Sequence, residues 1–246
     1  MKVFIQKKVD SPHWMNINCY SAAEWFWQLG WEVVPFSDLE AIKTELTKET
    51  PVIGGIGYVR KAVEYLGCKP PDPVDIPDCI SSYARRKIWT TTLNDIHVNE
   101  AQWPVFIKPL LDHKIFTGHV VRSFVDLLKT SGFPSEMPVL ASEAVTWDSE
   151  YRCFVLGREI LDIRKYAGTY EWYPNVHIIK EMIGSYPNLP AAYSIDVGRM
   201  VDFQGKVWDT ALVEVNDGFS LGTYGLSPHL QVKMLLARWK EMVNNK

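Results

Sequence analysis

The sequence has 246 residues, a formal net charge of −3 and a pI near 6.1. With 47% hydrophobic and 22% charged residues it has the balance of an ordinary soluble protein, long enough to bury one large core or two small ones. The weakly acidic charge gives no electrostatic reason to expect nucleic acid as a partner, and no apolar run approaches the roughly 20 residues that cross a bilayer.

The cysteines and the first residues bear on location. The four cysteines are scattered, with no C-x-x-C pair and no metal-ligand spacing, so reduced thiols are the economical expectation. The opening MKVFIQKKVD holds an apolar run too short for a signal peptide. These observations predict a soluble, cytoplasmic protein without a membrane contact.

The first part of the chain alternates strand and helix patterns. Capping boxes at Ser21 and Ser37 each open a predicted helix, and a glycine turn opens a third. This alternation predicts a small α/β unit with a parallel sheet. The predicted strands are residues 3–6, 31–36 and 51–53, and the predicted helices end near Leu29, Leu46 and Leu66.

A proline-rich linker follows this unit. Lys69–Pro77 holds four prolines and cannot be helical, so we place a domain boundary there and predict domains over 1–78 and 79–246. The next segment, SSYARRK, carries Arg85 and Arg86. These arginines either end a solvated basic helix or reach toward a bound anion.

The middle of the chain contains a strand that ends on a lysine. Trp103–Pro109, WPVFIKP, is apolar except for Lys108. Lys114 and Gly118 follow in a loop that leads into another strand. Val121–Thr130 then carries an apolar stripe at helical spacing, which predicts a helix packed against the core.

The segment SEAVTWDSEYRCFVL carries charged residues into an apolar strand. It places Glu143 and Glu150 seven residues apart. Arg152 comes two residues after Glu150 and therefore lies on the same face of the predicted strand. After a turn, a returning strand carries Arg164 and Lys165, either of which could face the same cleft.

Residues 191–225 predict a hairpin with a polar face. Residues two apart in a strand share a face, so Glu214 and Asn216 project together, with Asp196 beside them on the partner strand. Two carboxylates and an amide oxygen are hard donors that suit Mg²⁺. The alternative is a hairpin whose polar face is simply turned to water. A closing amphipathic helix is predicted over 228–243.

The order of these motifs resembles the ATP-grasp superfamily. The series FIKP, K-x-F-T-G, E-Y-R-x-F, D-V-G, E-V-N-D-G and Y-G, between Ser81 and Gly225, is similar to its compact R2K clade. The resemblance implies an α/β (α+β) fold in which two lobes clasp ATP, preceded by a small α/β pre-ATP-grasp domain. It divides residues 79–246 into a near lobe over about 79–140 and a far lobe over about 141–246.

The resemblance also implies roles for single residues. Lys108 and Lys114 would bind the phosphates, and the loop with Gly118 would close over them. The backbone up to Val145 would contact adenine, Glu143 would accept from its amine, and Glu150 would hold the ribose. The remaining implied residues are Asp196, Glu214 and Asn216 for Mg²⁺, and Arg152, with Lys108, for catalysis.

One departure from the family pattern concerns the metal site. The interval between Asp196 and Glu214 is longer than is usual for ATP-grasp enzymes. Asp202 or Asp209 could therefore be the partner of Glu214 instead.

The resemblance implies an ATP-dependent ligase that joins a carboxylate to an amine through an acyl-phosphate and releases ADP and phosphate. Its cofactors would be ATP and Mg²⁺, and its substrates small-molecule or peptide carboxylates and amines. Two alternatives remain open: a phosphotransferase acting on a single acceptor, and a non-catalytic ATP-binding module.

Overall fold

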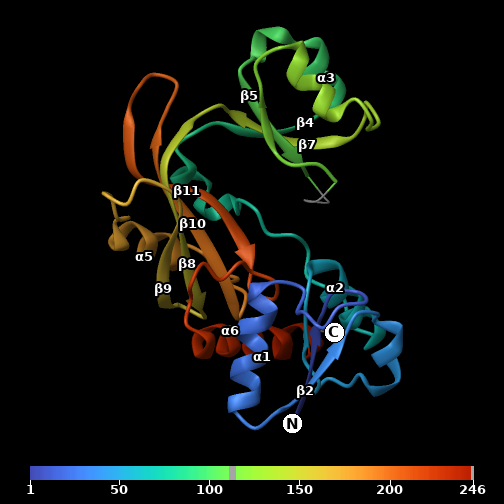
Figure 1. Cartoon of the computed structure of the whole chain (residues 1–246). Coiled ribbons are helices and arrows are strands. Elements are labelled where there is room, and N and C mark those ends of the chain that lie inside the picture. Colours follow the sequence, from blue (N-terminus) through green and yellow to red (C-terminus); the bar gives the residue numbers. More distant parts are fainter. Residues whose placement is uncertain (111–114, 245–246) are drawn as a thin grey trace.

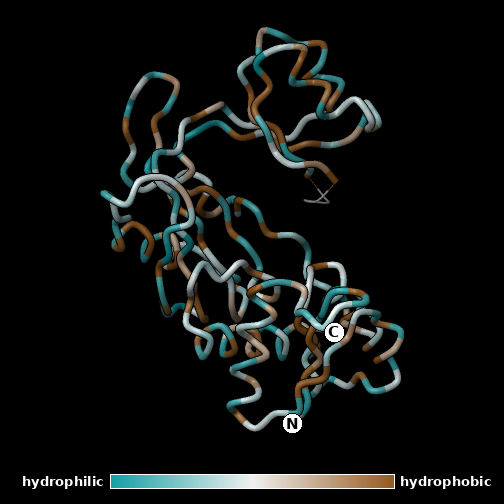
Figure 2. Tube along the Cα trace, viewed as in Figure 1, coloured by the Kyte–Doolittle hydropathy of each residue, from teal (hydrophilic) through white to brown (hydrophobic). Residues whose placement is uncertain are grey.

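The computed structural model describes residues 1–110 and 115–244, whose strands form three sheets (Figure 1). This mixture of helices and sheets confirms the predicted α+β class. Figure 2 shows hydrophobic and hydrophilic residues interspersed along the trace, with a hydrophobic stretch in the strand that follows the N-terminus. None of the helices in the described ranges is long and apolar enough to span a membrane.

The N-terminal sheet is parallel, as predicted, with the strand order β2-β1-β3. Its first helix begins four residues before the predicted capping box at Ser21, because the side chain of Asn16 accepts from the backbone N–H of Cys19 and caps the helix there. The second predicted helix is a 3₁₀ segment. The elements are β1 (Lys2–Gln6), α1 (Ile17–Gln28), β2 (Glu32–Phe36), η1 (Glu40–Glu45), β3 (Val52–Ile53) and α2 (Ile56–Tyr65).

The last helix, α6 (Pro228–Asn244), returns to this N-terminal unit and lies beside α1 (Figure 1). Trp239 of α6 packs in one core cluster with Phe4 of β1. Met234, on the same helix, packs against Phe154 in the sheet of the far lobe. Helix α6 thus joins both parts of the chain, and the division after residue 78 stays a prediction.

The near-lobe sheet has the strand order β4-β7-β5-β6 and is antiparallel. Strand β5 alternates in burial, so that Ile107 enters the core of the lobe while Phe106 and Lys108 face the opposite side. The elements are β4 (Ile88–Thr92), α3 (Leu93–Val98), η3 (Glu100–Gln102), β5 (Val105–Pro109), β6 (His119–Val121), α4 (Phe124–Leu127), η4 (Leu128–Thr130) and β7 (Pro138–Glu143).

The prediction of a packed helix over Val121–Thr130 was wrong. The segment forms only the single turn α4 and the 3₁₀ turn η4, and Phe124, Val125 and Leu128 are 59%, 72% and 70% exposed. Helix α3 already fills the core of this lobe through residues such as Ile96. The short helix α4 packs Leu127 against that core instead, which leaves Phe124, Val125 and Leu128 at the surface.

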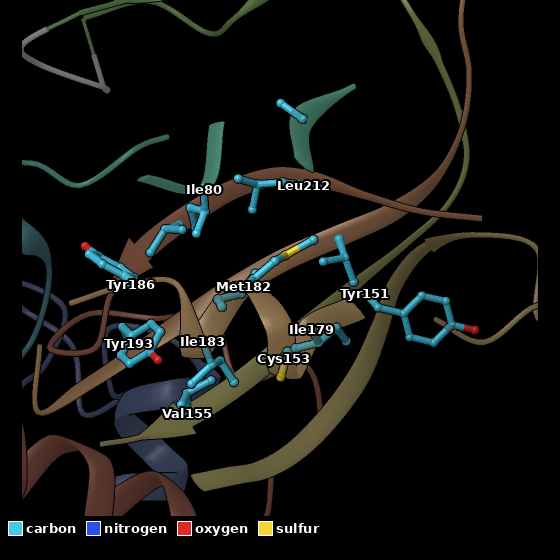
Figure 3. Close-up of a cluster of buried hydrophobic side chains, with 14 residues drawn as sticks. Ile80, Tyr151, Cys153, Val155, Ile179, Met182, Ile183, Tyr186, Tyr193 and Leu212 are labelled. Carbon is cyan, nitrogen blue, oxygen red and sulfur yellow. The ribbon is translucent and has the colours of Figure 1, made fainter. Parts of the chain in front are cut away.

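The far-lobe sheet is antiparallel, with the order β11-β10-β8-β9. Helix α5, which the sequence analysis did not predict, packs Met182 and Ile183 against Cys153 and Tyr193 of this sheet (Figure 3). Ile80, from the 3₁₀ segment before the near-lobe sheet, enters the same core. The elements are η2 (Asp78–Ala84), β8 (Thr146–Leu156), β9 (Glu159–Gly168), α5 (Val176–Gly184), β10 (Ala192–Val201) and β11 (Val207–Asp217).

Candidate active site

A cleft of about 360 Å³ lies between the near-lobe and far-lobe sheets. Phe106 and Leu140 line it from the near lobe, and Trp147 and Val213 line it from the far lobe. A few polar side chains interrupt these apolar walls. This combination of a largely apolar cleft with a few directed polar groups is typical of sites for small molecules and cofactors. Four of the predicted ATP-binding residues line it: Lys108, Gly118, Glu143 and Val145.

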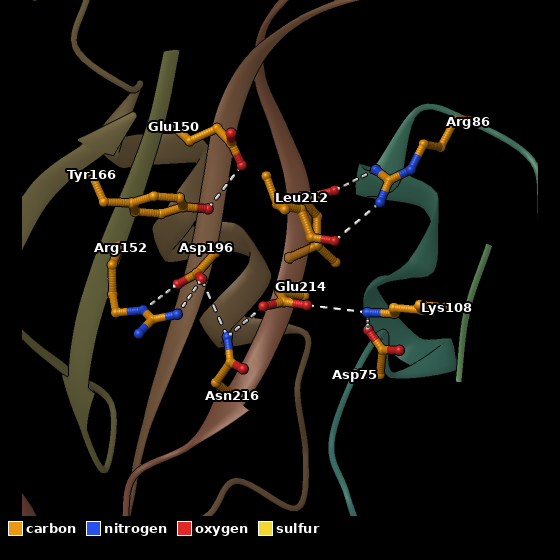
Figure 4. A network of polar contacts seen from close by, with 11 residues as sticks. Asp75, Arg86, Lys108, Glu150, Arg152, Tyr166, Asp196, Leu212, Glu214 and Asn216 are labelled. Carbon is orange, nitrogen blue, oxygen red and sulfur yellow. Dashed lines mark hydrogen bonds and ion pairs between the residues drawn. The ribbon is translucent and has the colours of Figure 1, made fainter. Parts of the chain in front are cut away.

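Lys108 connects three separate segments of the chain. Its Nζ atom donates to Asp75 Oδ1 at 2.7 Å and to Glu214 Oε2 at 3.1 Å (Figure 4). The backbone of Asp75 is fixed as well, because its carbonyl accepts from the N–H of Val215 at 2.6 Å. The linker, the near lobe and the far lobe therefore meet at one ammonium group.

Lys108 and the carboxylates around it stabilise each other's charged forms. Burial alone would lower the pKa of Lys108, but the Glu214 and Asp75 carboxylates outweigh it and raise that pKa above 10.5. Burial alone would raise the pKa of Glu214, but Lys108 and a hydrogen bond from Asn216 hold it below 4.5. Both groups are therefore charged near neutral pH.

Glu214 lines the cleft, and Asn216 and Asp196 lie next to it. Strand register pairs Glu214 with Asp196 directly, and the side-chain amide of Asn216 donates to both carboxylates, at 3.1 and 3.2 Å. Asp202 instead accepts from backbone N–H groups in the β10–β11 turn, and Asp209 is a largely exposed partner of Arg199. The register thus places Asp196, and neither alternative, opposite Glu214.

Arg152 and Asp196 form a buried, two-point ion pair. Arg152 Nε donates to Asp196 Oδ1 at 2.8 Å, and Nη2 donates to Oδ2 at 2.6 Å (Figure 4). Asp196 is only 1% exposed, so burial raises its pKa to about 6 while Arg152 opposes that rise. The pair holds the guanidinium in a fixed orientation.

Two tyrosines enclose the guanidinium of Arg152. Its Cζ atom lies 5.1 Å from the ring centroid of Tyr224 and 5.9 Å from that of Tyr166, and the two rings stack at 5.0 Å. The hydroxyl of Tyr166 donates to Glu150 at 2.9 Å. Glu150 is not among the residues that line the cleft, so its predicted contact with ribose stays a prediction.

The near-lobe wall of the cleft requires a glycine at position 118. A Cβ atom there would lie 2.7 Å from Phe106 Cζ and 3.1 Å from Lys108 Cβ. A larger residue would therefore displace the lysine side chain or the ring below it. The other predicted residue of this loop, Lys114, lies outside the described residues.

The hinge between the lobes carries Glu143. Its carboxylate accepts from the backbone N–H of Lys87 at 2.8 Å, and its own N–H donates to the carbonyl of Lys87. Glu143 thereby ties the segment before β4 to the end of β7. It also faces the cleft beside Val145.

The remaining predicted cations separate into two groups. Arg86 lines the cleft, where its guanidinium donates to the carbonyls of Leu212 and Val213, and burial lowers its pKa to about 10. Arg85, Arg164 and Lys165 are not among the residues that line the cleft, and each contacts a residue near it in the fold. Arg85 lies over the ring of Trp208, Arg164 pairs with Asp162, and Lys165 donates to the carbonyl of Gly168.

The donor set of this site fits a hard divalent cation. Glu214 and Asp196 supply carboxylate oxygens and Asn216 supplies an amide oxygen, which are ligands that Mg²⁺ accepts. No three His, Cys, Asp or Glu side chains within residues 1–110 and 115–244 gather closely enough to hold a metal alone. Phosphate oxygens of a nucleotide would thus have to supply further ligands.

Sequence reasoning missed three residues of this site: Asp75, Tyr166 and Tyr224. Asp75 lies in the proline-rich linker, where no periodicity marks a functional side chain. Tyr166 and Tyr224 belong to different segments and meet only in the fold. Their position beside Arg152 has no sequence signal apart from the Y-G that ends the motif series.

Comparisons with known proteins identify the family of this chain. The family described as ATP-grasp domain, R2K clade family 2, matches residues 83–234, more than half of the chain. No curated protein matches the sequence.

Solved structures resemble the chain over nearly its whole length. D-alanine–D-alanine ligase from Bacillus anthracis complexed with ATP is 14% identical, with a TM-score of 0.57, over 99% of this chain and 95% of that one. N5-carboxyaminoimidazole synthetase from Staphylococcus aureus complexed with ADP is 8% identical, with a TM-score of 0.59, over 99% and 78%. An ATP-grasp RimK domain protein from Sphaerobacter thermophilus is 15% identical, with a TM-score of 0.53, over 98% and 100%. At these identities the likeness shows the fold alone.

Proposed function

Because the chain belongs to R2K clade family 2 of the ATP-grasp domains, we propose that it is an ATP-dependent carboxylate–amine ligase. The observation that carries this proposal is the hydrogen-bond network that connects Lys108 and Glu214, which line the cleft, to Arg152. Two fixed cations beside a carboxylate–amide pair suit the transfer of a phosphoryl group to a carboxylate. The similar ligase structures, two of which hold ATP or ADP, support the same class.

The cleft would hold ATP along its length. Its apolar walls, with the hinge at Glu143 and Val145, suit the adenine ring, and Lys108 with the Gly118 turn suits the phosphates. Lys108 would exchange its present carboxylate partners for phosphate oxygens. The roles of Lys114 as a second phosphate ligand and of Glu150 as a ribose ligand stay predictions.

Glu214, Asn216 and Asp196 are the residues that would hold Mg²⁺. When bound, this ion would neutralise negative charge that develops on the β- and γ-phosphates. The protein's own part is to hold Glu214 and Asn216 on one strand face beside Lys108, where the Asn216 amide donates its N–H to Glu214 in this structure.

The reaction would proceed in two balanced steps. The substrate carboxylate attacks the γ-phosphorus of ATP, so that an acyl-phosphate forms and ADP leaves. The amine nitrogen then attacks the acyl carbon, the bond to the phosphate oxygen breaks, phosphate leaves, and the amine gives its surplus proton to solvent. Arg152, fixed by Asp196, would stabilise the moving phosphoryl group and then the tetrahedral intermediate.

The proposal is tested by measuring ADP release with ATP and Mg²⁺ over a panel of amino-acid and dipeptide carboxylates, with hydroxylamine as the trapping amine. Hydroxamate formed in step with ADP supports a ligase. ADP release that needs one acceptor and yields no hydroxamate would instead indicate the phosphotransferase, and no ADP release would indicate the non-catalytic module.

Two variants connect this activity to the site. Glu214→Gln keeps the shape of the side chain but removes a charge from the metal-binding set, so it is expected to abolish turnover while the protein remains folded. Lys108→Ala is expected to weaken ATP binding several-fold in calorimetry, with thermal shift by ATP and Mg²⁺ as a second readout. Wild-type activity of the Glu214 variant would exclude this residue from the metal site.

A further inference from the structure

A second, larger depression lies outside the nucleotide cleft. This acceptor groove has a volume of about 690 Å³ and runs between the beginning of α1 and residues 222–228. Asn18, Tyr20 and Glu24 line it from α1, and Thr223 and Tyr224 line it from the opposite side. None of the predicted ATP-binding or metal-binding residues is among its lining residues.

The two walls of the acceptor groove are joined by specific hydrogen bonds. Asn18 Oδ1 accepts from both the backbone N–H and the hydroxyl of Thr223, at 3.1 and 2.9 Å. The carbonyl of Asn18 also accepts from the side chain of Gln231 on α6 at 2.9 Å. Segments from both ends of the chain are therefore locked together at the floor of the groove.

Tyr224 forms a wall that the groove shares with the candidate active site. Tyr224 lines the groove, and the Cζ atom of the Arg152 guanidinium lies 5.1 Å from the centroid of the Tyr224 ring. Arg152 Nη1 further donates to the carbonyl of Gly222, which lines the groove too, at 3.3 Å. The groove therefore begins one aromatic ring away from the arginine assigned to the transferring group.

The backbone of Tyr224 is held in an unfavourable conformation. Its φ is +45°, in the left-handed region that non-glycine residues with large side chains rarely adopt. Stacking on Tyr166 and contact with Arg152 keep the ring in this position. Such strain concentrates at functional sites, where the surrounding structure fixes it.

The electrostatic character of the acceptor groove is one-sided. Among the described residues that line it, Glu24 is the single charged side chain, and none is a lysine, arginine or histidine. The smaller recess beside Asn216 differs, because charges of both signs line it: Arg60 on one hand and Asp72 and Asp217 on the other. A carboxylate ligand would find no counter-charge in the groove, whereas an ammonium group would find Glu24.

The apolar character of the groove comes from exposed side chains at its rim. Ile17 and Tyr20 of α1 are 69% and 48% exposed, and Tyr224 faces them with 47%. A depression with aromatic rims and one carboxylate suits a cation that carries an apolar or aromatic group.

We propose that the acceptor groove binds the amine substrate, and that this substrate is a cationic amine on an apolar or aromatic body. This inference rests on the ligase function proposed above and adds the chemical class and entry side of the acceptor. The amine would approach the acyl-phosphate past Tyr224, from the α1 side. Glu24 would attract the ammonium form before the amine loses its proton and reacts.

The first test measures binding without turnover. Phenylalaninamide carries an ammonium and an aromatic group but no carboxylate, and N-acetylphenylalanine carries the carboxylate but no ammonium. Calorimetry with the whole protein is expected to show phenylalaninamide binding and at least about tenfold weaker binding of N-acetylphenylalanine. Equal binding of the two probes, or no phenylalaninamide binding at millimolar concentration, would overturn the proposal.

Variants on α1 locate the bound probe. Glu24→Gln is expected to weaken phenylalaninamide binding by about fivefold, since the carboxylate is exposed to solvent. Tyr20→Ala is expected to weaken it to a similar degree. The matched controls are Glu64→Gln, an exposed glutamate on α2, and Trp27→Ala, an exposed aromatic on α1 outside the groove, and both should bind as wild type.

These results separate the inference from the function on which it rests. If Glu24→Gln and Tyr20→Ala bind the probe as tightly as wild type, the acceptor groove is excluded even where ADP release and hydroxamate formation succeed. If both variants weaken the probe but no acceptor pair gives ADP release, the groove stands as an amine site and the ligase proposal fails.

Discussion

Arg152 and Asp196 face each other from the neighbouring strands β8 and β10 and form two hydrogen bonds, of 2.8 and 2.6 Å. The strand register pairs these residues directly, so their side chains lie next to each other on the sheet. The same carboxylate accepts from Asn216, so the arginine proposed for catalysis and the residues proposed for Mg²⁺ share one hydrogen-bond network. A change at Arg152 therefore tests the network as well as the charge.

Arg152→Lys keeps a positive charge but loses the planar, two-point contact with Asp196. We expect turnover to fall by about 100-fold or more, as when one donor to a transition-state oxyanion is removed, while ATP affinity stays near that of wild type. Steady-state ADP release together with calorimetry measures both. Arg199→Lys, at a half-exposed ion pair with Asp148 on the same sheet, is the control and should retain activity. Full activity of the Arg152 variant would remove this residue from the mechanism.

We expect Asp75 to compete with the phosphates of ATP for Lys108. Its carboxylate lies 2.7 Å from Lys108 Nζ, and both side chains are 16% exposed. Asp75→Asn would free the ammonium and remove a repulsive charge, so we expect ATP to bind about fivefold more tightly in calorimetry.

Asp72→Asn is the matched control for Asp75, because Asp72 lies in the same linker but pairs with Lys69 at the surface. It should leave ATP affinity unchanged. Weaker ATP binding by Asp75→Asn would mean that this carboxylate assists nucleotide binding, contrary to the competition described above.

Gly118→Ala tests the close packing below the phosphate end of the cleft. The added methyl group would come within 2.7 Å of Phe106 Cζ and 3.1 Å of Lys108 Cβ. Overpacking of this kind destabilises by about 1–3 kcal/mol, and here it should also weaken ATP binding by displacing Lys108. Gly132→Ala meets no atom within 4 Å and serves as the control in urea denaturation and calorimetry. Identical results for the two variants would argue against a role for Gly118.

The pH dependence of the free energy of unfolding tests the environment of Glu150. Burial raises the pKa of its carboxyl above 4.5, and the hydroxyl of Tyr166 opposes that rise. The folded protein therefore holds this proton more tightly than the unfolded chain, so the contribution of Glu150 to the free energy of unfolding is lost as pH rises through and above 4.5. Since Gln does not titrate, Glu150→Gln should gain stability relative to wild type as pH increases. Urea denaturation over a pH series measures this difference, and a difference that falls with pH would contradict the prediction.

The sequence predicted the type of most elements but not every boundary. The predicted start of α1 was wrong. Asn and Ser both commonly cap helices, and only the folded backbone shows that Asn16 accepts from the N–H of Cys19 and caps α1. The segment with Phe124 was wrong for a different reason. Its apolar stripe has helical spacing, but the short helix turns Leu127, which is not part of that stripe, toward the core of the near lobe.

What the sequence by itself determined follows from backbone geometry. The two-residue period of a strand places Glu214 and Asn216 on one face and separates Lys108 from the buried Ile107, whatever the rest of the chain does. The order of such motifs also identified the ATP-grasp family, which the family match confirmed.

Only the tertiary structure decided which segments meet. Asp75 reaches Lys108 because the linker runs beside β11, and Tyr224 stacks on Tyr166 because the segment after β11 folds back over β9. The acceptor groove exists because Asn18, near the beginning of the chain, bonds to Thr223 near its end. Contacts of this range depend on how whole sheets and helices pack, and no local periodicity encodes them.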